Sequence, residues 1–170
     1  MPPSCLKGNM SMKTAAILML VVCLAALGGV GYLYITASVT VEPLEVIAAD
    51  AVSQAETYAQ LKAAVDNDTF VGTLFSRDPL ESPENDVFYT YTVRVTNRSF
   101  LPAELLELQV APMSGDFLQM GDPDAHDLPS GRSLDLSATI LTGKQSHNVR
   151  ELTVSYYIWG LPFFARLTSQ

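Results

Sequence analysis

The sequence predicts a mainly β protein in which an antiparallel β-sandwich of about seven strands follows an apolar N-terminal helix and one amphipathic helix. Three observations predict this architecture. Residues 14–35 contain no charged side chain, residues 44–65 repeat apolar side chains every three or four positions, and residues 70–168 alternate apolar with polar side chains. At 170 residues, the chain has room for one domain plus an appendage.

The first element is the apolar run from Thr14 to Ile35. A helix of that length spans about 33 Å, and a bilayer core is about 30 Å thick. Lys7 and Lys13 precede the run, and the next charge after them is Glu42. Lysines on the short side place it in the cytoplasm. We therefore expect a single-pass, uncleaved signal anchor in the cell membrane, with a cytoplasmic N-terminus (1–13) and an extracytoplasmic remainder.

Cleavage of this segment is the alternative. Small residues at 23–25 or 26–28 could serve a signal peptidase, but the apolar run continues past both. A lipoprotein signal at 20–23 has the bulky Val22 directly before Cys23. These features favour the anchor and leave cleavage open. Three methionines, Met1, Met10 and Met12, are possible starts.

A linker and an amphipathic helix are predicted over residues 36–69, and the loose alternation of residues 36–40 leaves a short strand there as an alternative to the linker. Pro43 suits a first helical turn, and Asn67-Asp68 suits the end. The apolar seam comprises Leu44, Ile47, Ala51, Gln54, Tyr58, Leu61 and Val65. It could pair with a second copy as a stalk or lie on the chain's own domain. Ala51 and Gln54 make a poor coiled-coil core, which favours the second interpretation.

The domain at 70–170 is predicted from its alternation. In residues 88–97, FYTYTVRVTN, tyrosines and valines face one side, while threonines and an arginine face the other. Similar patterns predict strands at 70–75, 106–110, 117–120, 134–140, 152–158 and 163–168. Turn residues and no helix separate them, so the sheets are antiparallel. Seven short strands in about 100 residues indicate a sandwich of the immunoglobulin-like kind.

The stretch YTVRVTNRSFLPAELLELQV, residues 91–110, carries a resemblance to known proteins. It resembles the edge of extracellular immunoglobulin-like modules, where a strand ends in Asn and a turn containing Pro leads to the next strand. Together with the anchor, the chain resembles membrane-anchored extracytoplasmic proteins of Gram-positive bacteria. That resemblance implies an extracytoplasmic location and no settled activity.

Charge and cysteine usage restrict the partners and chemistry. After Lys13 the chain has 8 basic and 18 acidic side chains, a net charge of −10. Because an acidic domain repels phosphate backbones, nucleic acid is not an expected partner. Cys5 and Cys23 both precede the predicted sandwich, which therefore has neither a disulfide nor a thiol nucleophile.

The loop GDPDAHDLPSG, residues 121–131, is the strongest metal-site pattern in the chain. Asp122, Asp124, His126 and Asp127 could offer oxygen and nitrogen ligands to Ca²⁺. The loop lacks the glycine of an EF-hand at its sixth position, and Ser133 replaces the bidentate glutamate. A solvated turn is favoured, so we expect no metal and no cofactor.

Catalytic motifs are missing from the sequence. Ser130, His126 and Asp127 could form a triad on paper, but no G-x-S-x-G surrounds the serine. The chain also lacks HExxH, P-loop and GxGxxG motifs. We therefore expect no enzyme activity, and a hydrolase is the least favoured function.

The segment SYYIWGLPFF, residues 155–164, contains the predicted binding surface. If Tyr156 and Ile158 face the core, Tyr157 and Trp159 face outward and can bind a protein or a sugar ring. Alternatively, the helix at 44–65 covers both rings through Tyr58 and Leu61, and this interpretation is favoured. The expected function is a non-catalytic interaction or assembly module of the cell envelope; the alternative is a cell-wall glycan-binding module.

Overall fold

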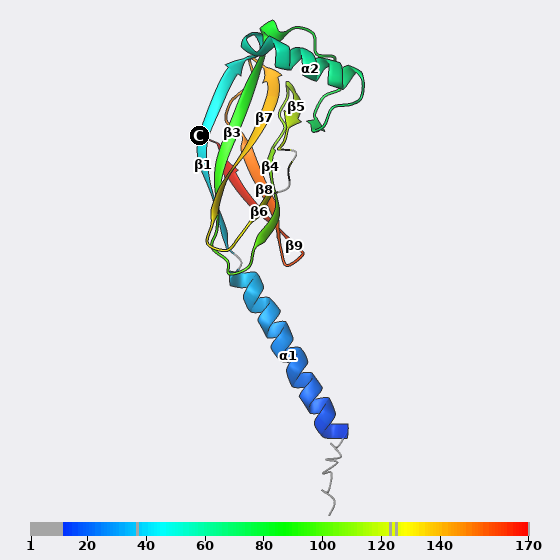
Figure 1. The fold of residues 1–170 in the computed structure, drawn as a ribbon, viewed down its shortest axis with the longest axis vertical. Helices are drawn as coiled ribbons and strands as arrows, with labels where there is room; N and C mark the ends of the chain where they lie inside the picture. Colours follow the sequence, from blue (N-terminus) through cyan, green and yellow to red (C-terminus); the bar gives the residue numbers. More distant parts are fainter. Residues whose placement is uncertain (1–11, 37, 123, 125, 170) are drawn as a thin grey trace, which may run out of the picture. The chain divides into compact units, whose positions relative to one another are not determined.

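The computed structural model describes residues 12–36, 38–122, 124 and 126–169 (Figure 1). The chain divides into two compact units, residues 1–37 and 38–170. In the first, α1 (Met12–Thr36) contains the expected span at 14–35, and it is long and apolar enough to cross a membrane. A signal sequence near the N-terminus can also form a helix that meets this criterion. Its large apolar side chains are exposed, so no core of the chain's own accounts for their hydrophobicity.

The second unit is a mainly β fold with two antiparallel sheets, which confirms the predicted sandwich (Figure 1). The five-stranded sheet has the order β1-β3-β7-β5-β2, and the four-stranded sheet has the order β6-β4-β8-β9. The described residues thus contain nine strands, two more than expected. Their bounds are β1 Val39–Asp50, β2 Thr73–Leu74, β3 Asp86–Asn97, β4 Ala103–Val110, β5 Asp116–Met120, β6 His126–Leu128, β7 Ser133–Gly143, β8 Glu151–Ile158 and β9 Leu161–Thr168.

The core lies between the sheets and follows the predicted alternation. In β3, Tyr91, Val93 and Val95 have no exposed surface, whereas Arg94 between them is exposed. In β8, Leu152 and Val154 are likewise at most 1% exposed. Burying side chains of this size contributes roughly 1.5–3 kcal/mol each, so the sandwich has a conventional core.

The predicted helix at 44–65 is wrong over its first half. Residues Val39–Asp50 form β1, an edge strand that pairs with β3 along its whole length. The register shifts between Pro43 and Glu45, where a bulge accommodates the proline. Only residues 55–66 form the helix α2 (Ala55–Asp66), which follows the 3₁₀ turn Ala51–Gln54. The apolar seam therefore crosses three separate elements.

Helix α2 packs on the chain's own domain, at the end of the five-stranded sheet where β1 ends (Figure 1). Tyr58 packs in a cluster with Phe88 and Leu141, and its hydroxyl donates a 2.9 Å hydrogen bond to Asp86. Desolvation is the main cause that raises the pKa of Asp86 above its usual range, and it also raises the pKa of Tyr58. The expected contact of Tyr58 and Leu61 with Tyr157 and Trp159 is wrong. Tyr58 and Leu61 pack on the five-stranded sheet, whereas Tyr157 belongs to β8 of the four-stranded sheet and Trp159 follows it.

Two other segments differ from expectation. The strand predicted at 70–75 is reduced to Thr73–Leu74, which pairs with β5. The predicted polar loop at 121–131 contains the short strand β6, which extends the four-stranded sheet beside β4. The polar residues of β6, HDL, hide that edge strand from a pattern search, since an edge strand has little to bury.

Candidate binding surface

Several turns meet at the end of the sandwich where the chain enters it, here called the entry end (Figure 1). The first residue of β1, Val39, pairs with Asn97 at the end of β3. Ser133, which begins β7, pairs with Thr96. At the start of β4, Glu104 pairs with Tyr157, next to the turn between β8 and β9. Residues far apart in the sequence therefore form one continuous end surface.

Asn97 fixes the turns of the entry end from inside. Its side chain has no exposed surface, and its Nδ2 donates to the carbonyl oxygens of Leu101 and Leu128, at 2.8 and 2.9 Å. Its Oδ1 accepts hydrogen bonds from the backbone N and the hydroxyl of Ser99. One buried amide thus joins the turn after β3 to the end of β6.

The β8–β9 turn presents Trp159 in a strained conformation. Trp159 and Gly160 have φ values of +53° and +73°, and they join the paired residues Ile158 and Leu161. Two positive φ angles in a two-residue loop make a type I′ hairpin, which favours Asn-Gly. A tryptophan in the left-handed region costs about 1–2 kcal/mol, and its ring is 67% exposed. Local stability does not explain the presence of Trp here.

Leu105 repeats this combination one strand away. It has a φ of +53°, lies in the bulge that interrupts the pairing of β4, and is 53% exposed. Its backbone N donates to Asp127 Oδ1 at 3.2 Å, which supports the bulge from β6. Strained backbone that presents an exposed apolar side chain is a feature of functional sites.

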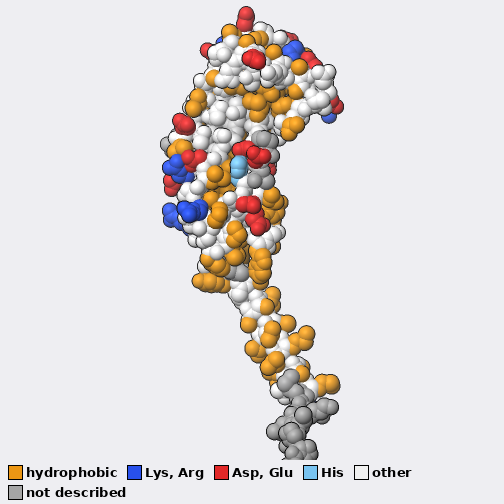
Figure 2. Space-filling model, in the orientation of Figure 1, with side chains coloured by type: hydrophobic (Ala, Val, Ile, Leu, Met, Phe, Trp, Pro, Cys, Tyr) orange, Lys and Arg blue, Asp and Glu red, His pale blue; other side chains and the backbone are white. Residues whose placement is uncertain are grey.

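These two side chains belong to a larger exposed apolar area. We call the set Leu105, Tyr157, Trp159, Leu161 and Phe164 the hairpin surface; its members are 39–67% exposed. In contrast, Tyr156 and Ile158 are at most 5% exposed, so Tyr157 and Trp159 face outward as the alternation predicts. Figure 2 shows hydrophobic side chains gathered at this end of the sandwich.

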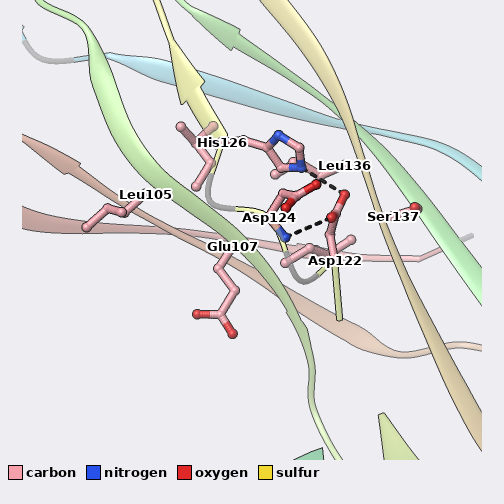
Figure 3. Close-up of a pocket in the computed structure, with 9 residues that line it drawn as sticks. Leu105, Glu107, Asp122, Asp124, His126, Leu136 and Ser137 are labelled. Atoms are coloured by element: carbon pink, nitrogen blue, oxygen red, sulfur yellow. Dashed lines mark hydrogen bonds and ion pairs between the residues drawn. The ribbon is translucent and has the colours of Figure 1, made fainter. Parts of the chain in front are cut away.

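The aspartate loop lines a groove of about 230 Å³ together with residues of β4 and of β7 (Figure 3). His126 Nε2 lies 2.8 Å from Asp122 Oδ2, and Asp122 Oδ1 accepts from the backbone N of Asp124. These hydrogen bonds, that of His126 above all, lower the pKa of the Asp122 carboxyl. Among the described residues, no three His, Cys, Asp or Glu side chains lie close enough to share a metal ion.

Ser130, His126 and Asp127, the residues of the possible triad, each form hydrogen bonds with other groups and not with one another. Ser130 Oγ donates to the Ser99 carbonyl at 2.6 Å, and Asp127 accepts from Leu105. His126 pairs with Asp122. Each polar group serves the loop structure, and no nucleophile–base contact is formed.

A second groove, of about 650 Å³, lies beside α2, between that helix and the segment 70–73. Leu61, Ala64 and Phe70 supply apolar walls, and Gln60 and Gln119 supply amides. Asp122 of the aspartate loop also lines it, whereas Tyr157 and Trp159 do not.

Comparisons with known proteins assign the chain to no family. No family model matches the chain, and no curated protein matches it. A FixG-related protein from Vibrio parahaemolyticus is similar in structure, with 13% identity over 79% of this chain and 94% of that one, at a TM-score of 0.37. The cupredoxin domain of amoB from Nitrosocaldus yellowstonii has 10% identity over 79% and 88%, at a TM-score of 0.33. Likeness at this level supports no functional conclusion.

Proposed function

We propose that the protein is a non-catalytic interaction module, anchored in the cell membrane by α1 with its sandwich outside, which binds through the hairpin surface. The observation that carries the proposal is the exposure of Trp159, at 67%, in a strained turn. A large aromatic ring held outward contributes binding energy when a partner covers it. The resemblance to membrane-anchored extracytoplasmic proteins of Gram-positive bacteria supports the proposed location.

The non-catalytic part of the proposal rests on how the polar groups are used. Ser130, His126 and Asp127 make separate contacts. No nucleophile in this set has a base within hydrogen-bond reach, and the sequence has no catalytic motif to replace it.

A photo-cross-linker at position 164 tests the binding role. In the full chain in native membranes, benzoylphenylalanine in place of Phe164 should form adducts on illumination, and the added Trp159→Ala change should reduce their yield several-fold. The control places the same group at Leu44, which is 48% exposed on β1 of the other sheet. Equal yields at both positions, or none at 164, would contradict the proposal. A glycan adduct would support the glycan-binding alternative.

The anchored topology has its own test. Cys5 precedes the span, and Ser53 is exposed in the second unit. A thiol reagent that cannot cross membranes should label Ser53→Cys in intact cells and label Cys5 only after permeabilisation. Cys23→Ser serves as the background for both measurements. Labelling of Cys5 in intact cells, or recovery of the chain in the soluble fraction, would rule the topology out.

A further inference from the structure

We propose that the hairpin surface docks on the lipid–water interface of the membrane that holds α1. The inference deepens the proposed function and rests on it, because it names the partner of the same surface. Four observations carry it: the length of chain between the span and the sandwich, the side-chain types at the entry end, the charges beside them and the strained backbone that presents them.

The covalent connection is short. The helix α1 ends at Thr36, and β1 begins at Val39. Three Cα–Cα steps of about 3.8 Å cover at most about 11 Å. A span held in a bilayer therefore keeps the entry end of the sandwich close to that bilayer's surface. The hairpin surface lies at this end, so lipid is the first large apolar phase that it meets.

The side chains match the chemistry of the interface. Tryptophan and tyrosine prefer the headgroup level, where the ring is in an apolar layer and the polar N–H or O–H stays hydrated. Trp159 and Tyr157 supply these two rings, and Leu105, Leu161 and Phe164 supply apolar side chains that insert beside them.

Charge at the entry end differs from that of the whole domain. Arg98 follows the last residue of β3, and Arg132 precedes the first residue of β7; both are exposed. Neither has an ion-pair partner within the described part of the chain. Arginines at this position attract lipid phosphates. Glu104, opposite Tyr157, and Asp127, which accepts from the Leu105 backbone N, are also exposed and oppose this attraction.

The backbone holds two of the apolar side chains outward against its own preference. Trp159 and Leu105 both have a φ of +53°. A glycine or asparagine at either position would relieve the strain and remove the apolar group. Insertion of these side chains into lipid gives a physical reason for the strained backbone in both the β8–β9 turn and the β4 bulge.

The chain contains a single tryptophan, so its fluorescence reports on the hairpin surface alone. We would reconstitute the full chain in nanodiscs of pure lipid, with spin-labelled lipids as quenchers near the headgroup or deep in the acyl chains. We expect about twofold quenching of Trp159 by the shallow label and much less by the deep label. Anionic lipid should strengthen the quenching, and Arg98→Gln with Arg132→Gln should remove that increase.

The control moves the reporter to the other end of the sandwich. Trp159→Phe with Val52→Trp places the ring in the turn after β1, where Val52 is 51% exposed. A strand of 12 residues separates it from the entry end, about 40 Å at roughly 3.3 Å per residue. We expect no quenching there by either label. Circular dichroism of both proteins confirms that the sandwich is folded.

The outcomes separate the inference from the function on which it rests. If the chain enters nanodiscs and Trp159 is quenched no more than the ring at position 52, lipid is not the partner and this inference is wrong. A protein adduct at position 164, with an unquenched Trp159, would assign the surface to a protein instead. If the chain does not enter nanodiscs at all, the anchor fails, and with it the proposed function.

Discussion

Replacement of Arg150 by methionine is expected to lower the free energy of unfolding of the sandwich by about 3–5 kcal/mol. Arg150 lies directly before β8, and its Nη2 donates to Asp116 Oδ1 at 2.8 Å. Neither side chain has any exposed surface. Methionine fills a similar volume but leaves the Asp116 carboxylate buried without a counter-charge, and an unpaired buried charge is among the costliest changes to a core.

The pair also joins the two sheets. Asp116 begins β5 in the five-stranded sheet, and its Oδ2 accepts from the backbone N of Met113 at 2.7 Å. On the other side, the backbone N of Arg150 donates to Ser169 Oγ, and Ser169 N donates to the Arg150 carbonyl. Buried Tyr91 lies near the pair, and desolvation raises its pKa to about 12. The ion pair thus fixes the end of the core opposite the entry end.

Urea unfolding of the full chain in detergent, followed by the circular dichroism of the strands, measures this loss. Arg94→Met is the matched control, because Arg94 pairs with Asp135 on the surface, where both side chains are more than 40% exposed. We expect a much smaller change there, since water screens the pair. Adding Asp116→Asn to Arg150→Met should recover part of the loss. Equal losses from Arg150→Met and Arg94→Met would contradict this account.

Most of the strands could be predicted because they are half-buried. The segment predicted at 88–97 lies within β3, and 152–158 lies within β8. In such strands the side-chain period is two and one face is in the core, so the burial requirement appears in the sequence. The same alternation predicts that Tyr157 and Trp159 face outward, which their exposure bears out.

The edge strand β1 could not be predicted in the same way. Its burial pattern is irregular, and Leu44 and Ile47 are both about half exposed. Leu44 and Ile47 are three residues apart, as in an amphipathic helix, although both lie in a strand. The pattern VTVE at residues 39–42 was the available signal, because β-branched residues favour strands, and Pro43 fits an edge.

The backbone conformation of the hairpin surface also could not be predicted from sequence patterns. A left-handed Trp159 contradicts residue preference, and the bulge at Leu105 depends on the register between β4 and β8. Register is set by contacts between segments distant in the chain, which a local pattern does not contain. Phe164 could have been found, because it follows the alternation of its own strand, in which Phe164, Arg166 and Thr168 are exposed.

The hydrogen bonds of Asn97 give the second large expected effect. We expect Asn97→Ala to lower the free energy of unfolding by about 2–4 kcal/mol, because it leaves several buried backbone groups without a hydrogen-bond partner. The carbonyl oxygens of Leu101 and Leu128 lose their Nδ2 donor, and Ser99 loses its acceptor. Asn97→Asp keeps the shape and the acceptors but removes the donors and buries a negative charge, so it should be at least as damaging.

The neighbouring Thr96→Ala change is the control, because the hydroxyl of Thr96 pairs with that of Ser133 at the surface, 2.9 Å away. It should alter the unfolding midpoint only slightly. Amide hydrogen exchange measures the effect of Asn97→Ala on individual segments. Amides of the turns at 98–102 and 128–132 should exchange faster, while those of β3 near α2 keep their protection. Uniform acceleration would mean that Asn97 supports the whole core, and unchanged exchange would mean that the turns hold without it. Faster exchange at the entry end alone would show that one buried amide positions the strands that carry the hairpin surface.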